Sequence, residues 1–243
     1  MAERNSSNLT RSAAQRLRER IVRGDFAGGT RLYEVALSDE MQISRTPARE
    51  AMSRLVEEGL LERAPGGGFQ VRAFTMADAI DSIELRGVLE GMAARLAAER
   101  GVDPAELEGI RALLVDLDGC FDGERVDFGV YAELNGRFHA ALAELCRSDV
   151  LLRELERVRG LPFASPSAFV LGGPEAARSL IVAQSQHHAL VAAIAAREGA
   201  RAEALAREHA LTARANLIDT SASQGGNLFR PAEGFPGQAL IVR

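Results

Sequence analysis

The stretch from residue 34 to residue 71 restricts the fold of this chain more than any other. Thr46 and Pro47 favour the start of a helix, because threonine caps free backbone N–H groups and proline lacks an N–H that the first helical position does not use. With a short helix over residues 34–41 before it, this predicts a helix, a tight turn and a second helix. Apolar residues in the second helix recur every three or four positions, which buries one face; they are Ala48, Ala51, Met52, Leu55 and Val56.

Two short strands are expected after the second helix. Gly59 ends that helix, and the first strand follows it. Residues 65–68, Pro-Gly-Gly-Gly, then predict a turn, and residues 69–71 return as the second strand. Together with a first helix over residues 10–23, this order of elements predicts a winged helix-turn-helix domain over residues 9–72.

Polar and basic residues gather at the N-terminal end of the second helix. A helix that presents arginines there, with a shorter helix packed behind it, suits the major groove of DNA. For Arg49 or Arg54 alone, a solvated helix face is the simpler interpretation, but the ordered helix, turn, helix and wing favours DNA contact. The candidate DNA-binding residues, including the wing tip, are Ser44, Arg45, Thr46, Arg49, Arg54, Gly67 and Gly68.

This segment resembles the signature of the GntR transcriptional regulators. Residues 44–52, Ser-Arg-Thr-Pro-Ala-Arg-Glu-Ala-Met, differ mildly from that signature at two positions, and residues 57–60, Glu-Glu-Gly-Leu, match the exit of the family's helix. The resemblance implies a homodimer that binds an inverted-repeat operator in double-stranded DNA, with one recognition helix per half-site. Two departures are Val35, where some members carry arginine, and Gly67, where many carry a basic residue.

The remaining chain is predicted to form an antiparallel bundle of about six helices over residues 75–220, without a convincing strand. Residues 73–74 are expected to link it to the first domain. Residues 1–8 are expected to be disordered. Residues 221–243, rich in glycine, serine and proline, are expected to be a tail that is mobile or laid over the surface. The fold class is therefore mainly α, with an N-terminal winged helix-turn-helix and a C-terminal all-α bundle.

Composition and charge restrict the class of protein. The net charge of −5 argues against a uniformly basic nucleic-acid binder, so DNA contacts must come from local placement of arginines. The N-terminus is polar and lacks the apolar core of a signal peptide, and no apolar run is long enough to cross a bilayer. We therefore expect a cytoplasmic protein without a membrane partner.

All four histidines lie in the second domain, namely His139, His187, His188 and His209. A single histidine on an apolar face is usually a core residue, but here three predicted helices each place one on their inward stripe. Asn135 lies one helical turn before His139, so the two side chains point to the same place. Three imidazoles and an oxygen inside a bundle predict a divalent transition-metal site of the zinc, nickel or manganese type, with a purely polar pocket as the alternative.

Two motifs of this domain resemble the all-helical ligand-binding domain, called FCD, of FadR-type regulators and their VanR-like subgroup. The motifs are residues 83–94 and the run Asn-Gly-Arg-Phe-His at residues 135–139. The resemblance favours His187 over His188, because the family separates its last two histidines by the same 22 positions that separate His187 from His209. An asparagine replaces the family's usual aspartate, which weakens the expected metal binding because an amide carries no charge. The implied metal ligands are Asn135, His139, His187 and His209.

Arg86 is the main candidate for effector binding. By analogy with the family it lies near the bundle interior, where an unpaired arginine is costly. It is therefore either a clamp for the carboxylate of a small organic acid or the partner of Glu90, four residues further along the helix. Gln184 and Asn216 are further candidates for the effector pocket.

These features predict a DNA-binding transcriptional regulator and not an enzyme, with repression relieved by the effector as the commoner mode of the family. One alternative is a metal-dependent hydrolytic enzyme that uses the three-histidine centre to activate water. Others are a metal-free ligand sensor, or a dimerisation module with a structural metal or none. Glu133 and Glu144 lie off the His139 face, so the hydrolase would lack a placed general base.

Overall fold

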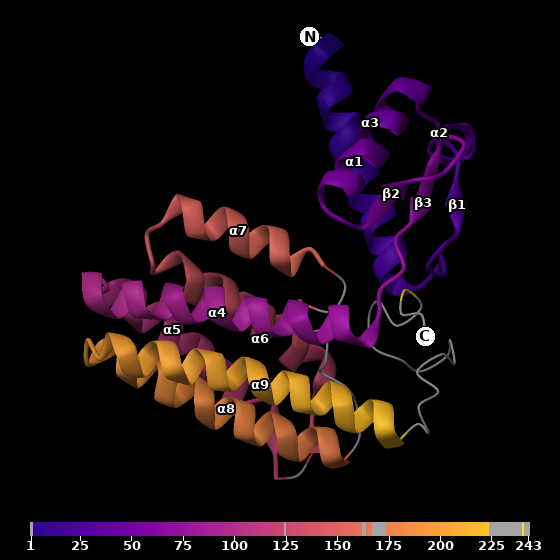
Figure 1. Cartoon of the computed structure of the whole chain (residues 1–243). Helices are drawn as coiled ribbons and strands as arrows, with labels where there is room; N and C mark the ends of the chain where they lie inside the picture. Colours follow the sequence, from indigo (N-terminus) through magenta and orange to yellow (C-terminus); the bar gives the residue numbers. More distant parts are fainter. Residues whose placement is uncertain (1, 124, 162–163, 167–173, 224–239, 241–243) are drawn as a thin grey trace. The chain divides into compact units, whose positions relative to one another are not determined.

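The structure is a computed structural model that describes residues 2–123, 125–161, 164–166, 174–223 and Leu240 (Figure 1). The chain divides into two compact units, which are described separately. One comprises residues 1–79 together with residues 227–243, and the other comprises residues 80–226. Helices dominate both units, which confirms the mainly-α fold class.

The first unit is a winged helix-turn-helix. Its strands pair antiparallel in the order β1-β3-β2, and the turn between β2 and β3 is the wing. Helix α1 packs on α3 through the predicted apolar stripe of α3, in which Ala48, Ala51, Met52 and Leu55 are fully buried. The elements are α1 (Ala2–Arg23), β1 (Arg31–Leu32), α2 (Glu34–Met41), α3 (Arg45–Glu57), β2 (Leu61–Arg63) and β3 (Phe69–Val71).

Two details of this unit differ from the sequence-based expectation. Helix α3 begins at Arg45 after the N-cap Ser44, whose side chain makes no capping hydrogen bond, so Thr46 is not the cap. Pro47 still lies in the first turn, where a missing N–H loses no intrahelical hydrogen bond, and the helix can therefore begin before it. Helix α1 starts at Ala2 where residues 1–8 were expected to be disordered, because a nucleated helix adds further residues at little cost.

In the part of the chain that the structure describes, the second unit is a helical bundle of six helices, which agrees with the prediction of about six. A correction concerns β4 and β5, which form a short hairpin where no strand was expected. Gly123 makes this turn possible with a φ of 61°, a left-handed conformation that glycine adopts without strain. The elements are α4 (Met76–Arg100), α5 (Pro104–Asp118), β4 (Phe121–Asp122), β5 (Arg125–Val126), α6 (Phe128–Glu144), α7 (Asp149–Arg159), α8 (Pro174–Ala195) and α9 (Gly199–Ser223).

Two glycines allow α9 to lie directly against α4. A Cβ atom built on Gly87 would come within 2.6 Å of the Ala210 Cβ, and one built on Gly91 would come within 3.1 Å of the Glu203 carbonyl oxygen. Helix α9 also packs along α8, so the two lie side by side in Figure 1. This close packing brings the polar residues of α4, α8 and α9 to one place in the bundle.

The ends of the bundle differ from the expected domain boundaries. The first turn of α4, up to Ala79, belongs to the first compact unit, whereas residues 73–74 had been expected to separate the domains. Helix α9 continues to Ser223, which includes the beginning of the expected tail. Residues 224–239 and 241–243 of that tail lie outside the described residues.

Within the described residues, none of the helices combines the length and apolar character needed to cross a bilayer.

Candidate DNA interface and histidine centre

Helix α3 and its N-cap present the predicted DNA-binding side chains to solvent. Ser44, Arg45, Thr46, Arg49 and Arg54 are all exposed. The Arg49 side chain is 63% exposed, and its Nε lies 3.4 Å from a Glu34 carboxylate oxygen of the neighbouring helix α2. An ion pair this exposed contributes little to stability, so the guanidinium is available to a DNA phosphate or base edge. The positive end of the helix dipole at this terminus further favours phosphate.

The wing tip is made of backbone alone. Gly66, Gly67 and Gly68 adopt φ values of 84°, 98° and 80°, which other residues rarely tolerate. The nearby positive charges come from the strands and were not singled out in the sequence. Arg31 of β1 donates a hydrogen bond to the Pro65 carbonyl at 2.6 Å, and Arg63 of β2 stacks over a phenylalanine ring of β3. These two arginines flank the wing and supply the charge that the glycine tip lacks.

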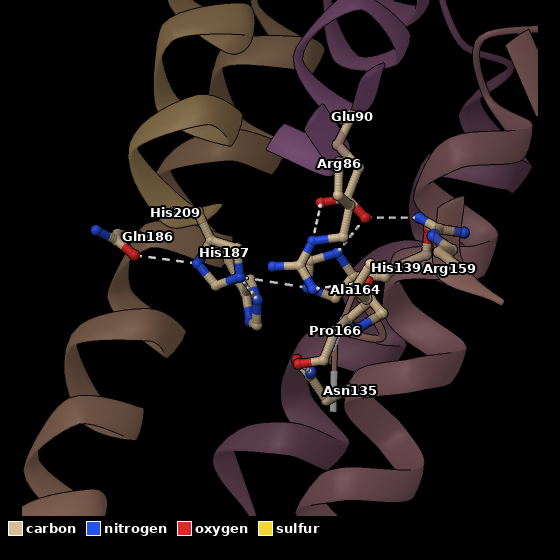
Figure 2. Close-up of polar contacts among 10 residues, drawn as sticks. All are labelled: Arg86, Glu90, Asn135, His139, Arg159, Ala164, Pro166, Gln186, His187 and His209. Atoms are coloured by element: carbon tan, nitrogen blue, oxygen red, sulfur yellow. Dashed lines mark hydrogen bonds and ion pairs between the residues drawn. The ribbon is translucent and has the colours of Figure 1, made fainter. Parts of the chain in front are cut away.

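The three predicted histidines meet inside the helical bundle (Figure 2). His139 comes from α6, His187 from α8 and His209 from α9, and all three are buried. Their ligand atoms lie within 4.8 Å of one another. The Nε2 of His209 lies 3.1 Å from the Nε2 of His187 and 3.3 Å from the Nε2 of His139. A cation about 2.0–2.1 Å from each nitrogen would separate the nitrogens by about 3.0–3.4 Å, so the spacing fits a shared transition metal.

The opposite edge of each ring is held by an oxygen. The Nδ1–oxygen distances are 3.3 Å for His139 and Glu90, 3.0 Å for His187 and Gln184, and 3.0 Å for His209 and Gln186. Carboxylate and amide oxygens only accept hydrogen bonds, so the proton of each neutral ring sits on Nδ1. The Nε2 lone pairs of His187 and His139 therefore both lie against the Nε2 of His209, an arrangement that a cation would stabilise.

The protonation states support the same conclusion. Burial lowers the pKa of His139 and, to a greater extent, of His187, and it lowers the pKa of His209 to about 3. The rings thus remain neutral near pH 7, which is the form that binds metals.

A buried carboxylate contacts one ring of the histidine centre. Glu90 of α4 contacts Arg159 of α7 at 2.8 Å and Arg86 at 3.6 Å, in addition to His139. Although burial opposes its ionisation, the hydrogen bond from His139 and the charges of Arg86 and Arg159 outweigh that effect and hold the pKa of Glu90 well below its usual range. Sequence reasoning considered Glu90 only as a partner of Arg86. Its contact with a histidine 49 positions away could not be seen from helical spacing, which relates only near neighbours.

Arg86 has one of the two roles that were considered for it, because it pairs with Glu90, and it also borders a cavity. Besides its ion pair with Glu90, it donates from one terminal nitrogen to the Ala164 carbonyl at 3.2 Å. It also lines a small cavity of about 30 Å³ together with Tyr131, Asn135, His209 and Asn216. The predicted pocket residues Arg86 and Asn216 are therefore brought together beside one of the histidines.

Tyr131 is a pocket residue that the sequence did not reveal. Its side chain is buried, and among the described residues its hydroxyl has no hydrogen-bond partner. Burial raises its pKa, so the hydroxyl remains a donor. A buried hydroxyl without a partner is costly, and a ligand oxygen in the cavity would satisfy it. The spacing of Tyr131 one turn before Asn135 was the available signal, but a core aromatic residue has the same spacing.

The other residues considered for the metal site or the effector pocket lie in three different environments. Asn135 is buried beside the cavity and donates from its amide nitrogen to the Pro166 carbonyl at 3.1 Å, which leaves the amide oxygen as its potential ligand atom. Gln184 does not line the cavity as expected, because its amide nitrogen bonds Asp118 and its oxygen holds His187. His188, whose side chain is half exposed, also contacts Asp118.

Two family models match the chain, and together they account for both units. "Bacterial regulatory proteins, gntR family" matches residues 9–71, and "FCD domain" matches residues 81–212. The chain belongs to the GntR family of transcriptional regulators and carries an FCD domain. This confirms the predicted family and the prediction of a regulator, not an enzyme.

Individual relatives agree with this assignment. The HTH-type transcriptional repressor GlaR of Escherichia coli strain K12 is 30% identical over 198 residues, which cover 81% of this chain and 90% of GlaR. The Nta operon transcriptional regulator of Aminobacter aminovorans is 35% identical over 138 residues, covering 55% of this chain and 64% of that regulator, or less than two thirds of its length. The solved structure of E. coli McbR/YncC, 24% identical, has the same fold, with a TM-score of 0.66 over 87% of this chain and 98% of that one.

Proposed function

We propose that this regulator senses a small organic acid through a divalent transition metal, of the zinc, nickel or manganese type, in its helical domain. The observation that carries the proposal is the convergence of three unprotonated Nε2 atoms, with spacings of 3.1 and 3.3 Å that suit one cation. His139, His187 and His209 would hold the metal, joined by the amide oxygen of Asn135. When bound, the metal would supply open coordination positions for oxygen atoms of the effector.

The cavity beside the histidines supports a carboxylate as the effector group. Arg86 brings a positive charge, and Tyr131 and Asn216 bring polar groups to its wall. An anion that accepts from Arg86 and from the Tyr131 hydroxyl would satisfy donors that are otherwise buried without a full set of partners. The small volume, about 30 Å³, favours an acid of few atoms.

For the DNA-binding unit we infer a homodimer in the cytoplasm that places one α3 helix in each half-site of an inverted repeat. Arg45 and Arg49 would contact guanine edges or phosphates, and the exposed N-terminus of α3 would hold a phosphate. Repression is inferred as the mode of action, because the relative GlaR is a transcriptional repressor. The effector would act through its differential affinity for two arrangements of the protein.

Metal removal separates this proposal from its alternatives. Elemental analysis would measure bound metal, and duplexes selected in vitro for binding to the regulator would report DNA affinity during titration with acetate, lactate, malate and citrate. We expect at least one acid to change the DNA affinity, and a chelator to abolish that change while leaving the basal affinity intact. An acid response that survives the chelator would indicate a metal-free sensor, and a chelator effect on melting temperature alone would indicate a structural metal.

A further inference from the structure

Leu240 packs within the winged helix-turn-helix unit. Residues 227–243 belong to the same compact unit as residues 1–79, although the last helix of the bundle ends at Ser223. Leu240 is fully buried, with 0% of its surface exposed. Burying a leucine side chain contributes about 1.5–3 kcal/mol. Its burial therefore indicates a specific docking position.

The docking position adjoins the segment that leads from the wing to α4. The backbone N–H of Phe74 donates a hydrogen bond to the Leu240 carbonyl at 2.7 Å. Phe74 is itself buried, and the Arg72 guanidinium lies over its ring at 4.8 Å from the centroid. The Leu240 backbone is thus bonded to the residue that directly precedes the capping box of α4, in which Thr75 and Asp78 bond each other.

A glycine on the opposite side makes room for this contact. Gly28 lies in the loop between α1 and β1, and a Cβ atom there would be only 3.0 Å from both the Leu240 carbonyl oxygen and the Ala73 side chain. Contacts this short require a neighbour to move. The missing side chain of Gly28 therefore leaves a notch, bounded by Gly28 and residues 73–74, that the Leu240 carbonyl occupies.

We propose that the C-terminal segment is an intramolecular strap, which docks on the winged helix-turn-helix unit through Leu240 and holds the linker at Phe74. The helical domain would then be attached to the DNA-binding unit at both of its ends, through Thr75 at its start and through the strap at its finish. The family models end at residues 71 and 212, so neither includes the strap. It is a feature of this chain beyond the two family domains.

The second attachment has a consequence for DNA binding, which rests on the proposed dimeric function. Two connections restrict the movement of a DNA-binding unit more than one connection does, so less freedom is lost when both units of a dimer bind an inverted repeat. Releasing the strap should therefore weaken binding to a complete inverted repeat and leave binding to a single half-site unchanged.

Hydrogen exchange on the full chain tests the docking directly. Leu240→Asp places a charge at a buried position and should release the strap, whereas Leu240→Met keeps an apolar side chain of similar volume and should retain it. We expect the Phe74 amide to exchange about tenfold faster or more in Leu240→Asp, and at the wild-type rate in Leu240→Met. Gly28→Ala, which crowds the notch from the other side, should also accelerate exchange at Phe74. Unchanged Phe74 exchange in Leu240→Asp would overturn the strap.

Two further measurements separate release of the strap from a general loss of folding and from docking between two copies of the chain. In Leu240→Asp, the metal content and the melting of the helical domain should match the wild type. If either is lost, the Phe74 exchange rate in Gly28→Ala is used instead to test the docking. Protection of Phe74 should not depend on protein concentration, and a loss on dilution would show that the segment docks on a second copy instead. For duplexes selected in vitro, we expect Leu240→Asp to weaken binding to the full repeat by about three- to tenfold. An equal loss of affinity for a single half-site would reject the proposed restraint of the DNA-binding unit. The docking of Leu240 would then still be tested by the exchange rate of the Phe74 amide.

Discussion

The DNA-binding helix and the histidine centre place their functional side chains in opposite ways. The candidate DNA contacts of the helix come from one continuous run, Ser44 to Arg54, and remain exposed on a helix whose other face is buried. The histidine centre draws on α4, α6, α8 and α9 and is buried throughout. Contacts on an exposed helix therefore contribute to the binding free energy almost independently of one another. Buried groups that fix one another's protons contribute jointly, so that the loss of one affects the others.

The largest effect should follow from removing one ligand of the histidine centre. His139→Ala should lose bound metal and the response to acids, because two imidazoles remain where three converge. Elemental analysis and DNA titration would measure both, and basal DNA binding should persist. His188→Ala is the matched control, since His188 is half exposed and contacts Asp118. Normal metal content in His139→Ala would remove that residue from the ligand set.

The burial of the three histidines also predicts that the stability of the metal-free protein depends on pH. Burial lowers the pKa values of His139, His187 and His209, so the folded chain cannot take up the protons that the unfolded chain binds near pH 6.5. The free energy of unfolding should therefore decrease as the pH falls below about 6.5, by at most about 1.4 kcal/mol per pH unit for each ring. Urea unfolding in the presence of a chelator, at pH values above and below 6.5, would measure it. A stability that rises on acidification through this range would contradict the assigned neutral rings.

Replacing a side chain that contacts a histidine Nδ1 atom should lower the metal affinity strongly, but less than replacing a histidine ligand. Glu90→Gln keeps the size of the side chain and removes the charge that faces His139 and Arg159. We expect metal affinity to fall about 10–100-fold. Competition with a chelator of known affinity would measure the change. Glu84→Gln serves as the control, because Glu84 lies on the same helix in an exposed pair with Arg214.

On the DNA-binding helix, single substitutions should have moderate and separable effects. Arg49→Ala should weaken binding to a selected duplex by about 1–3 kcal/mol if Arg49 contacts a base. Fluorescence anisotropy would measure it, and metal content should not change. Arg111→Ala, an exposed arginine of the helical domain paired with Glu108, should have no effect. Equal weakening by both substitutions would show that bulk charge, and not the placement of Arg49, determines affinity.

The last expected effect is on stability and concerns the packing that connects α4 to α9. Gly87→Ala would bring a methyl group to 2.6 Å from the Ala210 Cβ, which requires α9 to move. We expect a loss of about 1–3 kcal/mol in thermal or chemical unfolding, together with weaker metal binding because His209 lies on the displaced helix. Gly109→Ala is the control, since a Cβ at that helical position meets nothing within 4 Å. It should be neutral or stabilising by up to about 1 kcal/mol.

Several features were determined by the sequence by itself. The three-and-four spacing of Ala48, Ala51, Met52 and Leu55 specified a buried helix face, because helical geometry relates residues one turn apart. The same periodicity selected His139, His187 and His209 as inward residues of their helices. Turn and cap residues located the wing and the order of the helices. The exact helix starts were less certain, as the cap at Ser44 shows, because several residues in a first turn satisfy the same rules.

Only the tertiary structure decided which distant groups meet. Gln186 and Glu90 hold Nδ1 atoms of histidines on other helices, and no spacing along the chain encodes such a contact. Tyr131 has the spacing of an ordinary core residue, and its role in the cavity depends on the side chains that α4 and α9 bring beside it. Leu240 lies in a segment whose composition suggested a tail, yet it is buried, and its carbonyl oxygen occupies a notch left by Gly28. Local periodicity chooses the face of a helix, but the packing of helices decides what that face contacts.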